Sequence, residues 1–337
     1  MKSIALIGTG RIGTHHARTL AKEVDGIQLV ALLDPMEEAT RKLADELGIS
    51  RVETDPLALV DDPSIDGVVI TSPSEYHVEQ IEAYAAAGKQ IFTEKPLGVT
   101  VEEATRALDA CEKAGVILQV GFNRRFAEAW SSAEKAIADG KVGDVQMMRS
   151  VTRDPGPYGG DPAHTPLGTI FTQTLIHDFD TLNWLNSDAE PVAVHATADA
   201  LIRPDAKKDG FLDTAIVTIT YSNGAMATAE ASFCAMYGYD LRGEVLGSEG
   251  MVRMGSPVSS GAEVFDASGL HQDTAGTDTS RYHESYRLEF QAFSDLVNGN
   301  DVTYPDGKAG LFAQLVAQAA IVSATENRIV TIEEVRA

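Results

Sequence analysis

The feature that most constrains the fold is an apolar strand followed directly by a glycine-rich turn. Residues 3–7 read Ser-Ile-Ala-Leu-Ile, and residues 8–13 read Gly-Thr-Gly-Arg-Ile-Gly. In such a strand–turn–helix unit the first glycine permits the turn, the second lets the backbone approach a pyrophosphate, and the third lets helix and strand pack closely. The N-terminus of the helix then supplies N–H groups and a positive dipole end for an anion. The motif alone also fits an ordinary glycine-rich turn.

A carboxylate in the expected place favours a dinucleotide-binding turn over an ordinary glycine-rich turn. Asp34 ends the β-rich run Gln28–Leu33, about twenty residues after the last glycine, where a ribose-binding acid belongs. Such an acid hydrogen-bonds the 2′-hydroxyl of NAD and repels the 2′-phosphate of NADP. The sequence therefore predicts a site for NAD. The residues of this first region expected to contact NAD are Gly8, Thr9, Gly10, Arg11, Ile12 and Asp34.

Up to about residue 120, β-rich runs alternate with helical patterns. The runs after the first two include Gly67–Ile70 and Gln90–Thr93, and the helices include Glu75–Ala87 and Val101–Ala114. A small helix is also expected around Pro56–Val60. This alternation predicts an α/β doubly wound parallel sheet that binds ligands beyond the C-terminal ends of its strands.

The pattern changes after a helix that is expected at Ala127–Asp139. Strand-like segments separated by turn residues predominate, interrupted by one helix at Thr174–Leu185 and closed by helices at Tyr286–Asn298 and Lys308–Glu326. We therefore expect two domains: 1–122, which binds the dinucleotide, and 123–337, an α+β domain with an open, mainly antiparallel sheet. The outer face of that sheet needs a cover, which favours a homo-oligomer packed sheet to sheet.

Composition and charge exclude several classes of partner. The chain has 337 residues, 44% of them hydrophobic and 23% charged, and a formal net charge of −23. That charge argues against nucleic acid and against anionic membranes, and the apolar runs read as too short to cross a bilayer. Cys111 and Cys234 form no disulfide framework, and no metal-ligand spacing occurs. With no signal-peptide pattern at the N-terminus, a cytoplasmic protein without a metal is expected.

Two side chains have the chemistry of a dehydrogenase. Lys95 follows a predicted strand and could stabilise the charge on a substrate oxygen, although a solvated loop lysine is equally consistent with the pattern. His177 lies in the helix at Thr174–Leu185 and could accept a hydroxyl proton near neutral pH. A lone histidine near an apolar helix face is also common in protein cores.

Five motifs in order resemble the Gfo/Idh/MocA family of oxidoreductases over essentially the whole chain. They are the glycine motif, Thr71-Ser72-Pro73 with His77, Glu94-Lys95-Pro96, residues 121–126 (Gly-Phe-Asn-Arg-Arg-Phe) and residues 176–180 (Ile-His-Asp-Phe-Asp). Residues 153–157 (Arg-Asp-Pro-Gly-Pro) and 237–240 (Tyr-Gly-Tyr-Asp) are similar to stretches of the inositol dehydrogenases in that family.

The resemblance implies a Rossmann domain that carries NAD, frequent tetramers, and oxidation of a ring hydroxyl in a cyclic polyol or sugar, with myo-inositol as the expected substrate. It makes Lys95 and His177 catalytic. It adds to the cofactor-binding set Thr71, Ser72, Pro73, His77, Glu94 and Lys95. The implied substrate-side residues are Lys95, Arg124, Asp154, Gln173, His177 and Tyr237. From the residues alone, Arg124 could equally be a surface ion-pair residue and Tyr237 a packed strand aromatic.

Gln173 departs from the family pattern. The family usually has Asp four residues before the histidine, where a carboxylate can share its proton. Gln keeps the hydrogen bonding but not the charge. This leaves open a tolerated substitution, a changed substrate (another inositol isomer or an aldose), or a non-catalytic sensor of NAD or sugar. The presence of Lys95 and His177 favours the enzyme.

Overall fold

The computed structural model describes residues 1–336, which form two compact units. Unit 1 combines Met1–Phe126 with Glu284–Gln314, and unit 2 combines Ala127–His283 with the described residues from Leu315 onward. The sequence suggested a single boundary after residue 122. The structure instead returns a later segment, Glu284–Gln314, to the first unit.

Unit 1 is built on a six-stranded sheet in the order β3-β2-β1-β4-β5-β6, in which all neighbours are parallel. Its strands are β1 (Lys2–Ile7), β2 (Ile27–Leu33), β3 (Arg51–Glu53), β4 (Gly67–Ile70), β5 (Gln90–Thr93) and β6 (Leu118–Val120). The strand order reverses direction between β1 and β4, and ligands bind at such a switch point in open α/β sheets.

Helices cover this sheet, as the alternation of the sequence predicts. They are α1 (Arg11–Glu23), α2 (Glu37–Leu47), α3 (His77–Ala86), α4 (Val101–Ala114) and α8 (His283–Val297), with the first part of α9 (Gly307–Glu326). Both ends of α4 can be predicted from the sequence. At its start, Thr100 and Glu103 form a reciprocal capping box. At its end, Gly115 adopts the left-handed conformation that terminates the helix.

Two expected helices of this region differ in the structure. Pro56–Val60 forms turns and no helix. The helix expected at Glu75–Ala87 is divided into a 3-10 turn, Ser74–Tyr76, followed by α3. Pro73 directly precedes the 3-10 turn, and its missing N–H and fixed φ suit the entry to a turn.

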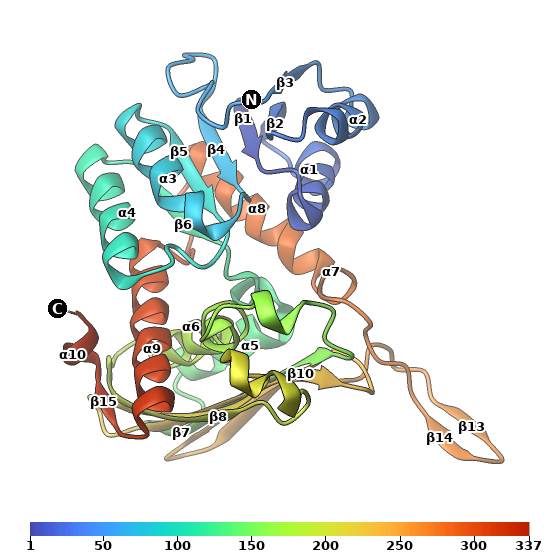
Figure 1. Ribbon diagram of the computed structural model, residues 1–337, viewed down its shortest axis with the longest axis vertical. Coiled ribbons are helices and arrows are strands. Elements are labelled where there is room, and N and C mark those ends of the chain that lie inside the picture. The colour runs from blue at the N-terminus through green and yellow to red at the C-terminus, as the bar shows by residue number, and fades with distance from the viewer. Residues whose placement is uncertain (337) are drawn as a thin grey trace. The chain divides into compact units, whose positions relative to one another are not determined.

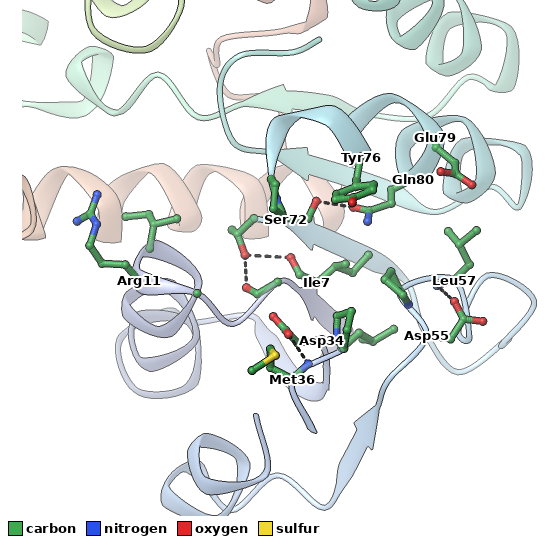
Figure 2. Close-up of a pocket in the computed structure, with 18 residues that line it drawn as sticks. Ile7, Arg11, Asp34, Met36, Asp55, Leu57, Ser72, Tyr76, Glu79 and Gln80 are labelled. Carbon is green, nitrogen blue, oxygen red and sulfur yellow. Dashed lines mark hydrogen bonds between the residues drawn. The ribbon is translucent and has the colours of Figure 1, made fainter. Parts of the chain in front are cut away.

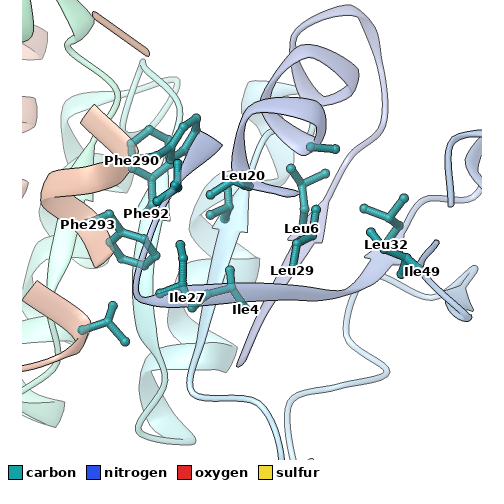
Figure 3. Packing of buried hydrophobic residues seen from close by; sticks show 14 of the residues in the cluster. Ile4, Leu6, Leu20, Ile27, Leu29, Leu32, Ile49, Phe92, Phe290 and Phe293 are labelled. Atoms are coloured by element: carbon teal, nitrogen blue, oxygen red, sulfur yellow. The ribbon is translucent and has the colours of Figure 1, made fainter. Parts of the chain in front are cut away.

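The core of unit 1 depends on α8. Phe290, Phe293 and Val297 of this helix join the cluster of buried side chains that contains Phe92 of β5 and Ile4 of β1. Figure 3 shows the two α8 rings against Phe92 and beside Ile27. In Figure 1 the orange α8 lies beside the blue elements of the N-terminal segment. Burial of these aromatic rings is the reason that a segment near residue 290 belongs to the N-terminal unit.

Unit 2 contains a seven-stranded sheet in the order β12-β11-β7-β10-β9-β8-β15. Its strands are β7 (Val145–Pro155), β8 (Pro191–Asp199), β9 (Thr214–Tyr221), β10 (Met226–Ala235), β11 (Asp240–Gly247), β12 (Met251–Gly255) and β15 (Val330–Thr331). The pairing is antiparallel except between β7 and β10. The predicted mainly antiparallel sheet is confirmed, with this one parallel pair added.

The sheet of unit 2 has one buried and one exposed face. Along β9, buried Ala215, Val217 and Ile219 alternate with outward side chains such as Ile216, as a half-buried strand requires. The helices of this unit are α5 (Glu128–Ala138), α6 (Ile176–Leu185), α7 (Asp278–Arg281), α10 (Ile332–Arg336) and the rest of α9. A small hairpin of β13 (Val264–Asp266) and β14 (Gly269–His271) extends from the rest of unit 2 (Figure 1) and was not predicted.

Helix α9 corrects the expectation that every apolar run of the chain is too short to cross a bilayer. By length and composition alone this helix could cross a membrane, with a mean hydropathy of 1.2 over its most apolar window. Half of that window is buried inside the protein, and core helices of soluble proteins pass the same test.

Candidate active site

The three glycines after β1 have three different environments. Gly8 adopts a φ of +93°, and a Cβ there would lie 2.6 Å from the backbone N of Ser72. A Cβ on Gly13 would lie 1.9 Å from the carbonyl oxygen of Gly8. A Cβ on Gly10 would meet nothing within 4 Å. Gly8 and Gly13 are thus required by the protein itself, whereas the space above Gly10 is open, as the cradle of a pyrophosphate requires.

A cavity of about 820 Å³ opens at the C-terminal ends of β1, β2 and β4. Figure 2 shows Asp34 and Met36 after β2 and Ser72, Tyr76 and Gln80 after β4 around it. Its lining residues are Ile7, Gly8, Gly10, Arg11, Ile12, Leu33, Asp34, Pro35, Met36, Asp55, Pro56, Leu57, Thr71, Ser72, Pro73, Tyr76, Glu79 and Gln80. The shape and the open Gly10 backbone fit a dinucleotide.

Charge in this cavity is mostly negative. Its lining residues include three acids, Asp34, Asp55 and Glu79, and one basic residue, Arg11. The Asp34 carboxylate is fixed by two backbone N–H donors, Thr9 at 2.7 Å and Met36 at 2.8 Å. A fixed carboxylate suits the hydroxyls of a ribose and opposes an added phosphate. The residues present therefore fit NAD.

Most of the residues expected to bind the cofactor line this cavity. They are Gly8, Gly10, Arg11, Ile12, Asp34, Thr71, Ser72 and Pro73. Four others are not among its lining residues: Thr9, His77, Glu94 and Lys95. The side-chain oxygen of Thr9 is 2.7 Å from that of Thr40 on α2, so its hydroxyl serves the packing of that helix.

Sequence reasoning missed a second group of lining residues. They are Met36, Asp55, Leu57, Tyr76, Glu79 and Gln80. All of them follow the strands β2, β3 or β4, so the strand-end rule could have found them. No residue type in this group marks it, which is why a motif search passes over it.

His77 is a structural connection between two loops. Its ring is buried, with Nδ1 2.8 Å from the carbonyl oxygen of Pro96 and Nε2 2.9 Å from that of Ser72. Burial lowers the pKa of His77, against the opposing effect of these two contacts. A neutral imidazole donates one hydrogen bond only. His77 thus lies between the loop after β4 and the loop that carries Lys95, and it donates a hydrogen bond to one of the two carbonyl oxygens.

Lys95 and Arg124 also belong to unit 1. Lys95 follows β5 in a partly exposed position, between Glu94 and Pro96. Arg124 lies in the 3-10 turn Asn123–Phe126 after β6, and only 2% of its surface is exposed. The reading of Arg124 as a surface ion-pair residue is therefore wrong: the sequence cannot show that the turn folds inward.

In unit 2, a buried carboxylate fixes the helix that carries His177. Asp178 accepts hydrogen bonds from the hydroxyls of Ser150 and Thr152 on β7, the second at 2.6 Å. Asp178 is completely buried, so the two hydroxyls replace its hydration. This contact sets the position of α6 on the sheet, and with it the backbone of His177.

Asp154 and Gln173 come to the same end of α6. Thr174 donates from its hydroxyl to Asp154 Oδ2 at 3.2 Å, which ties the end of β7 to the residue beside Gln173. The structure differs from expectation in the local helix type: Ile170–Thr174 is a π-helical turn, and α6 begins at Ile176. Gln173 and His177 thus lie in consecutive helical segments. Single π turns occur often at functional sites.

Tyr237 is placed differently from Asp154. Its hydroxyl donates to Asp240 Oδ2 at 2.7 Å and accepts from Arg153 Nη1 at 3.0 Å. Arg153 and Asp154 are successive residues of β7, so their side chains leave opposite faces of the sheet. The hydroxyl of Tyr237 is therefore engaged on the face away from Asp154.

The described residues contain no group of three or more His, Cys, Asp or Glu side chains that could hold a metal ion.

Comparison with known proteins gives a consistent result along the chain. Residues 2–122 match the oxidoreductase family model with an NAD-binding Rossmann fold, and residues 130–253 match the GFO/IDH/MocA C-terminal domain. The chain is 37% identical to scyllo-inositol 2-dehydrogenase (NAD(+)) of Bacillus subtilis, over 87% of this chain and 85% of that protein. It is 34% identical to myo-inositol 2-dehydrogenase of Thermotoga maritima, over 98% and 99% respectively.

A solved structure agrees with these relatives. The fold matches scyllo-inositol dehydrogenase from Lactobacillus casei with bound cofactor NAD(H) and scyllo-inositol, with a TM-score of 0.93 and 28% identity. The match covers 99% of each chain. Sequence and fold together show that this chain belongs to the GFO/IDH/MocA family of NAD-dependent oxidoreductases.

Proposed function

We propose that this chain is an NAD-dependent dehydrogenase that oxidises one secondary ring hydroxyl of an inositol, first of all the 2-hydroxyl of myo-inositol, to a ketone. The observation that carries the proposal is the start of α6, where the Thr174–Asp154 contact, Gln173 and His177 gather polar groups. Hydroxyl-rich, uncharged substrates are recognised by such donors and acceptors. The related inositol dehydrogenases, similar along nearly the whole chain, support the same substrate class.

In this proposal two side chains act on the substrate. His177 accepts the proton of the reacting hydroxyl, which imidazole does well near neutral pH. Lys95 stabilises the negative charge that develops on the oxygen. Bound NAD supplies the hydride acceptor, and Asp34 with the glycine turn holds its ribose and pyrophosphate. The C–H bond breaks as the C=O bond forms, so the products are a ketone, NADH and one proton.

The named relatives include enzymes for both the myo and the scyllo isomer. These isomers differ only in the configuration at the carbon that is oxidised, so both yield the same ketone. Gln173 replaces the acid of the family pattern. Because of this replacement, three alternatives remain: the second isomer as substrate, an aldose as substrate, or a role as a sensor. The hydrogen-bonded Asp154 at the same end of α6 favours a polyol substrate.

The direct test is spectrophotometric. The purified protein is incubated with NAD and, separately, myo-inositol, scyllo-inositol, other inositols and a set of aldoses, while NADH absorbance is followed. We expect turnover of at least one inositol. Reduction of the common ketone with NADH, followed by identification of the isomer formed, then names the substrate. Binding of NAD without turnover of any inositol or aldose would favour the sensor.

The exposed face of the unit 2 sheet supports a homo-oligomer. Its outward side chains include Met147, Ile216, Met226, Leu246 and Met251, each between 39% and 53% exposed. Apolar side chains spread over neighbouring strands favour packing against a second copy of the chain, and a tetramer fits the family resemblance. Light scattering of the purified protein tests this proposal.

We also propose that the protein is cytoplasmic, a location supported by its two free cysteines.

A further inference from the structure

A buried carboxylate that is hydrogen-bonded to a histidine lies directly before Lys95 in the chain. Nε2 of His16, on α1, is 2.6 Å from Oε1 of Glu94. The His16 residue is completely buried, and Glu94 is 9% exposed. The sequence places Glu94 in a motif but gives no sign that a histidine 78 residues earlier meets it. Neither side chain is among the residues that line the NAD cavity.

The surroundings of this pair are apolar on the histidine side. The His16 ring makes edge contacts with Phe290, Tyr286 and Phe92, at centroid distances of 4.7, 5.1 and 6.5 Å. Figure 3 shows Phe92 and Phe290 packed together in the core that adjoins His16. Because few polar groups screen it there, the hydrogen bond between His16 and Glu94 is stronger than a comparable pair on the surface.

The other oxygen of Glu94 is fixed as well. Oε2 accepts the backbone N–H of Lys95 at 3.2 Å. A Cβ on Gly121 would lie 2.9 Å from the same oxygen, so the carboxylate rests against glycine backbone where no larger residue fits. Burial alone would raise the pKa of Glu94, but the hydrogen bond from His16 and the charges of His16 and Lys95 hold it below its usual value. Glu94 therefore carries a negative charge beside Lys95.

We propose that Glu94 and His16 are positioning residues for Lys95: Glu94 holds the Lys95 backbone and keeps its ammonium group charged, and His16 fixes Glu94 to the helix that begins at the glycine turn. The inference rests on the proposed function of Lys95. In this inference α1 has two roles. Its N-terminus forms the anion site, and His16, further along the helix, holds Glu94 in the loop that carries Lys95. The anion site and this loop are thus both fixed to one helix.

Other titratable groups face this pair. His77 on α3 interacts electrostatically with both Glu94 and Lys95, and burial lowers its pKa, so it is neutral near neutral pH. The rings of His15 and Tyr286 lie 5.8 and 5.1 Å from the His16 ring. Glu94 is thus the anion of this group that adjoins Lys95 directly. Removing its charge makes loss of the Lys95 proton easier.

The test compares Glu94→Gln with a matched control, Glu46→Gln. Gln retains an oxygen for His16 but has no charge. Glu46 is an exposed carboxylate on α2 that is bonded to Arg18 of α1. Its change therefore tests a carboxylate that also contacts α1, but away from Lys95. For Glu94→Gln we expect kcat to fall about tenfold or more, with KM for NAD changed less than twofold. The basic limb of the pH profile of kcat should move about one pH unit lower. Glu46→Gln should leave both unchanged.

The same substitution in a Lys95→Ala variant separates this inference from the proposed role of Lys95, on which it rests. If Glu94 acts through Lys95, then Glu94→Gln added to Lys95→Ala should cause no further loss of kcat. Near-normal activity of Lys95→Ala alone would refute the role of Lys95. A large further loss in the double variant would refute the positioning role of Glu94 while leaving Lys95 intact.

His16→Asn provides an independent measurement if Glu94→Gln does not fold. It keeps a side-chain donor and leaves the Glu94 charge in place, so we expect a smaller fall in kcat, with NAD affinity retained. The melting temperature should fall, because the buried ring contacts of His16 are lost. A folded Glu94→Gln or His16→Asn protein with native kcat and a native pH profile would overturn the proposal.

Discussion

The Asp34 carboxylate accepts the backbone N–H of Thr9 at 2.7 Å, so the acid at the end of β2 is tied to the glycine turn after β1. This contact fixes the carboxylate before any ribose arrives. A fixed negative charge discriminates between NAD and NADP more strongly than a mobile one, because it cannot withdraw from a 2′-phosphate.

We therefore expect the protein to prefer NAD to NADP by well over tenfold, and Asp34→Ser to reduce that preference. Dissociation constants for both cofactors, from fluorescence titration, measure it. Asp55→Asn is the matched control: it removes a carboxylate of the same cavity that is bonded to the N–H of Leu57 and not to the glycine turn. Equal affinity of the unaltered protein for NAD and NADP would contradict the assignment.

The glycine turn offers a pair of variants with opposite effects. In Gly10→Ala the new methyl group meets no protein atom within 4 Å, so stability should change by less than about 1 kcal/mol. NAD affinity should nevertheless fall at least tenfold, because the methyl group occupies the space of the pyrophosphate. In Gly13→Ala the methyl group would lie 1.9 Å from the Gly8 carbonyl oxygen, so the free energy of unfolding should fall by about 1–3 kcal/mol or more. Urea unfolding and NAD titration separate the two; equal stability of both variants would show that the turn can relax.

The two proposed acting side chains should each be needed for turnover. His177→Ala should lower kcat by about a hundredfold or more, the range for loss of a general base. Lys95→Ala should have a comparable effect without loss of folding. Lys42→Ala and His271→Ala, which change the same residue types at exposed positions, serve as controls. If either Lys95→Ala or His177→Ala kept near-normal turnover, that role would be withdrawn.

Gln173→Asp should change the pH dependence of the reaction. His177 must be neutral to accept a proton, so activity is lost when pH falls through the pKa of its imidazole. A carboxylate nearby favours the imidazolium form, so the acid limb of kcat should move to higher pH in Gln173→Asp. Gln173→Asn, which makes the same shortening without the charge, should leave the limb in place. If neither the pH profile nor the ranking of polyols changes, Gln173 does not act on His177.

The two cysteines should differ in reactivity. Cys111 is buried in α4, and burial raises the pKa of its thiol to about 12. The thiolate is the reactive form, so alkylation of Cys111 should be negligible at neutral pH. Cys234 is partly exposed and should react in the native protein. Mass spectrometry should find one modified cysteine in the native protein and two in denaturant, with Cys234→Ser leaving none that reacts before unfolding.

Local patterns explain what the sequence predicts well. The strand Gly67–Ile70 and the helix Val101–Ala114 have the predicted bounds because a continuous apolar run, a capping box and a terminal glycine are all local signals. Asp34 was found because its spacing from the glycines follows from one strand–helix–strand unit. The same logic located the end of β4 at the cavity.

Long-range packing explains what the sequence does not predict. The amphipathic pattern of α8 shows that this helix has a buried face but not that Phe92 of β5 covers it. The burial of Arg124 and the His16–Glu94 contact likewise depend on segments distant in the chain. The π turn at Ile170–Thr174 has no pattern of its own, because the shift to a wider hydrogen-bond spacing leaves residue types unchanged.

The late return of α8 to unit 1 has a consequence for synthesis on the ribosome. The first 126 residues emerge with the place of Phe290, Phe293 and Val297 still unfilled. Since chains are made at about 5–20 residues per second, this incomplete core waits on the order of ten seconds or more for its closing helix. During that time almost all of the inserted unit 2 sequence is produced. Until α8 has left the ribosome, the apolar surface of the N-terminal unit that this helix covers stays exposed, and exposed apolar surface of this kind favours aggregation.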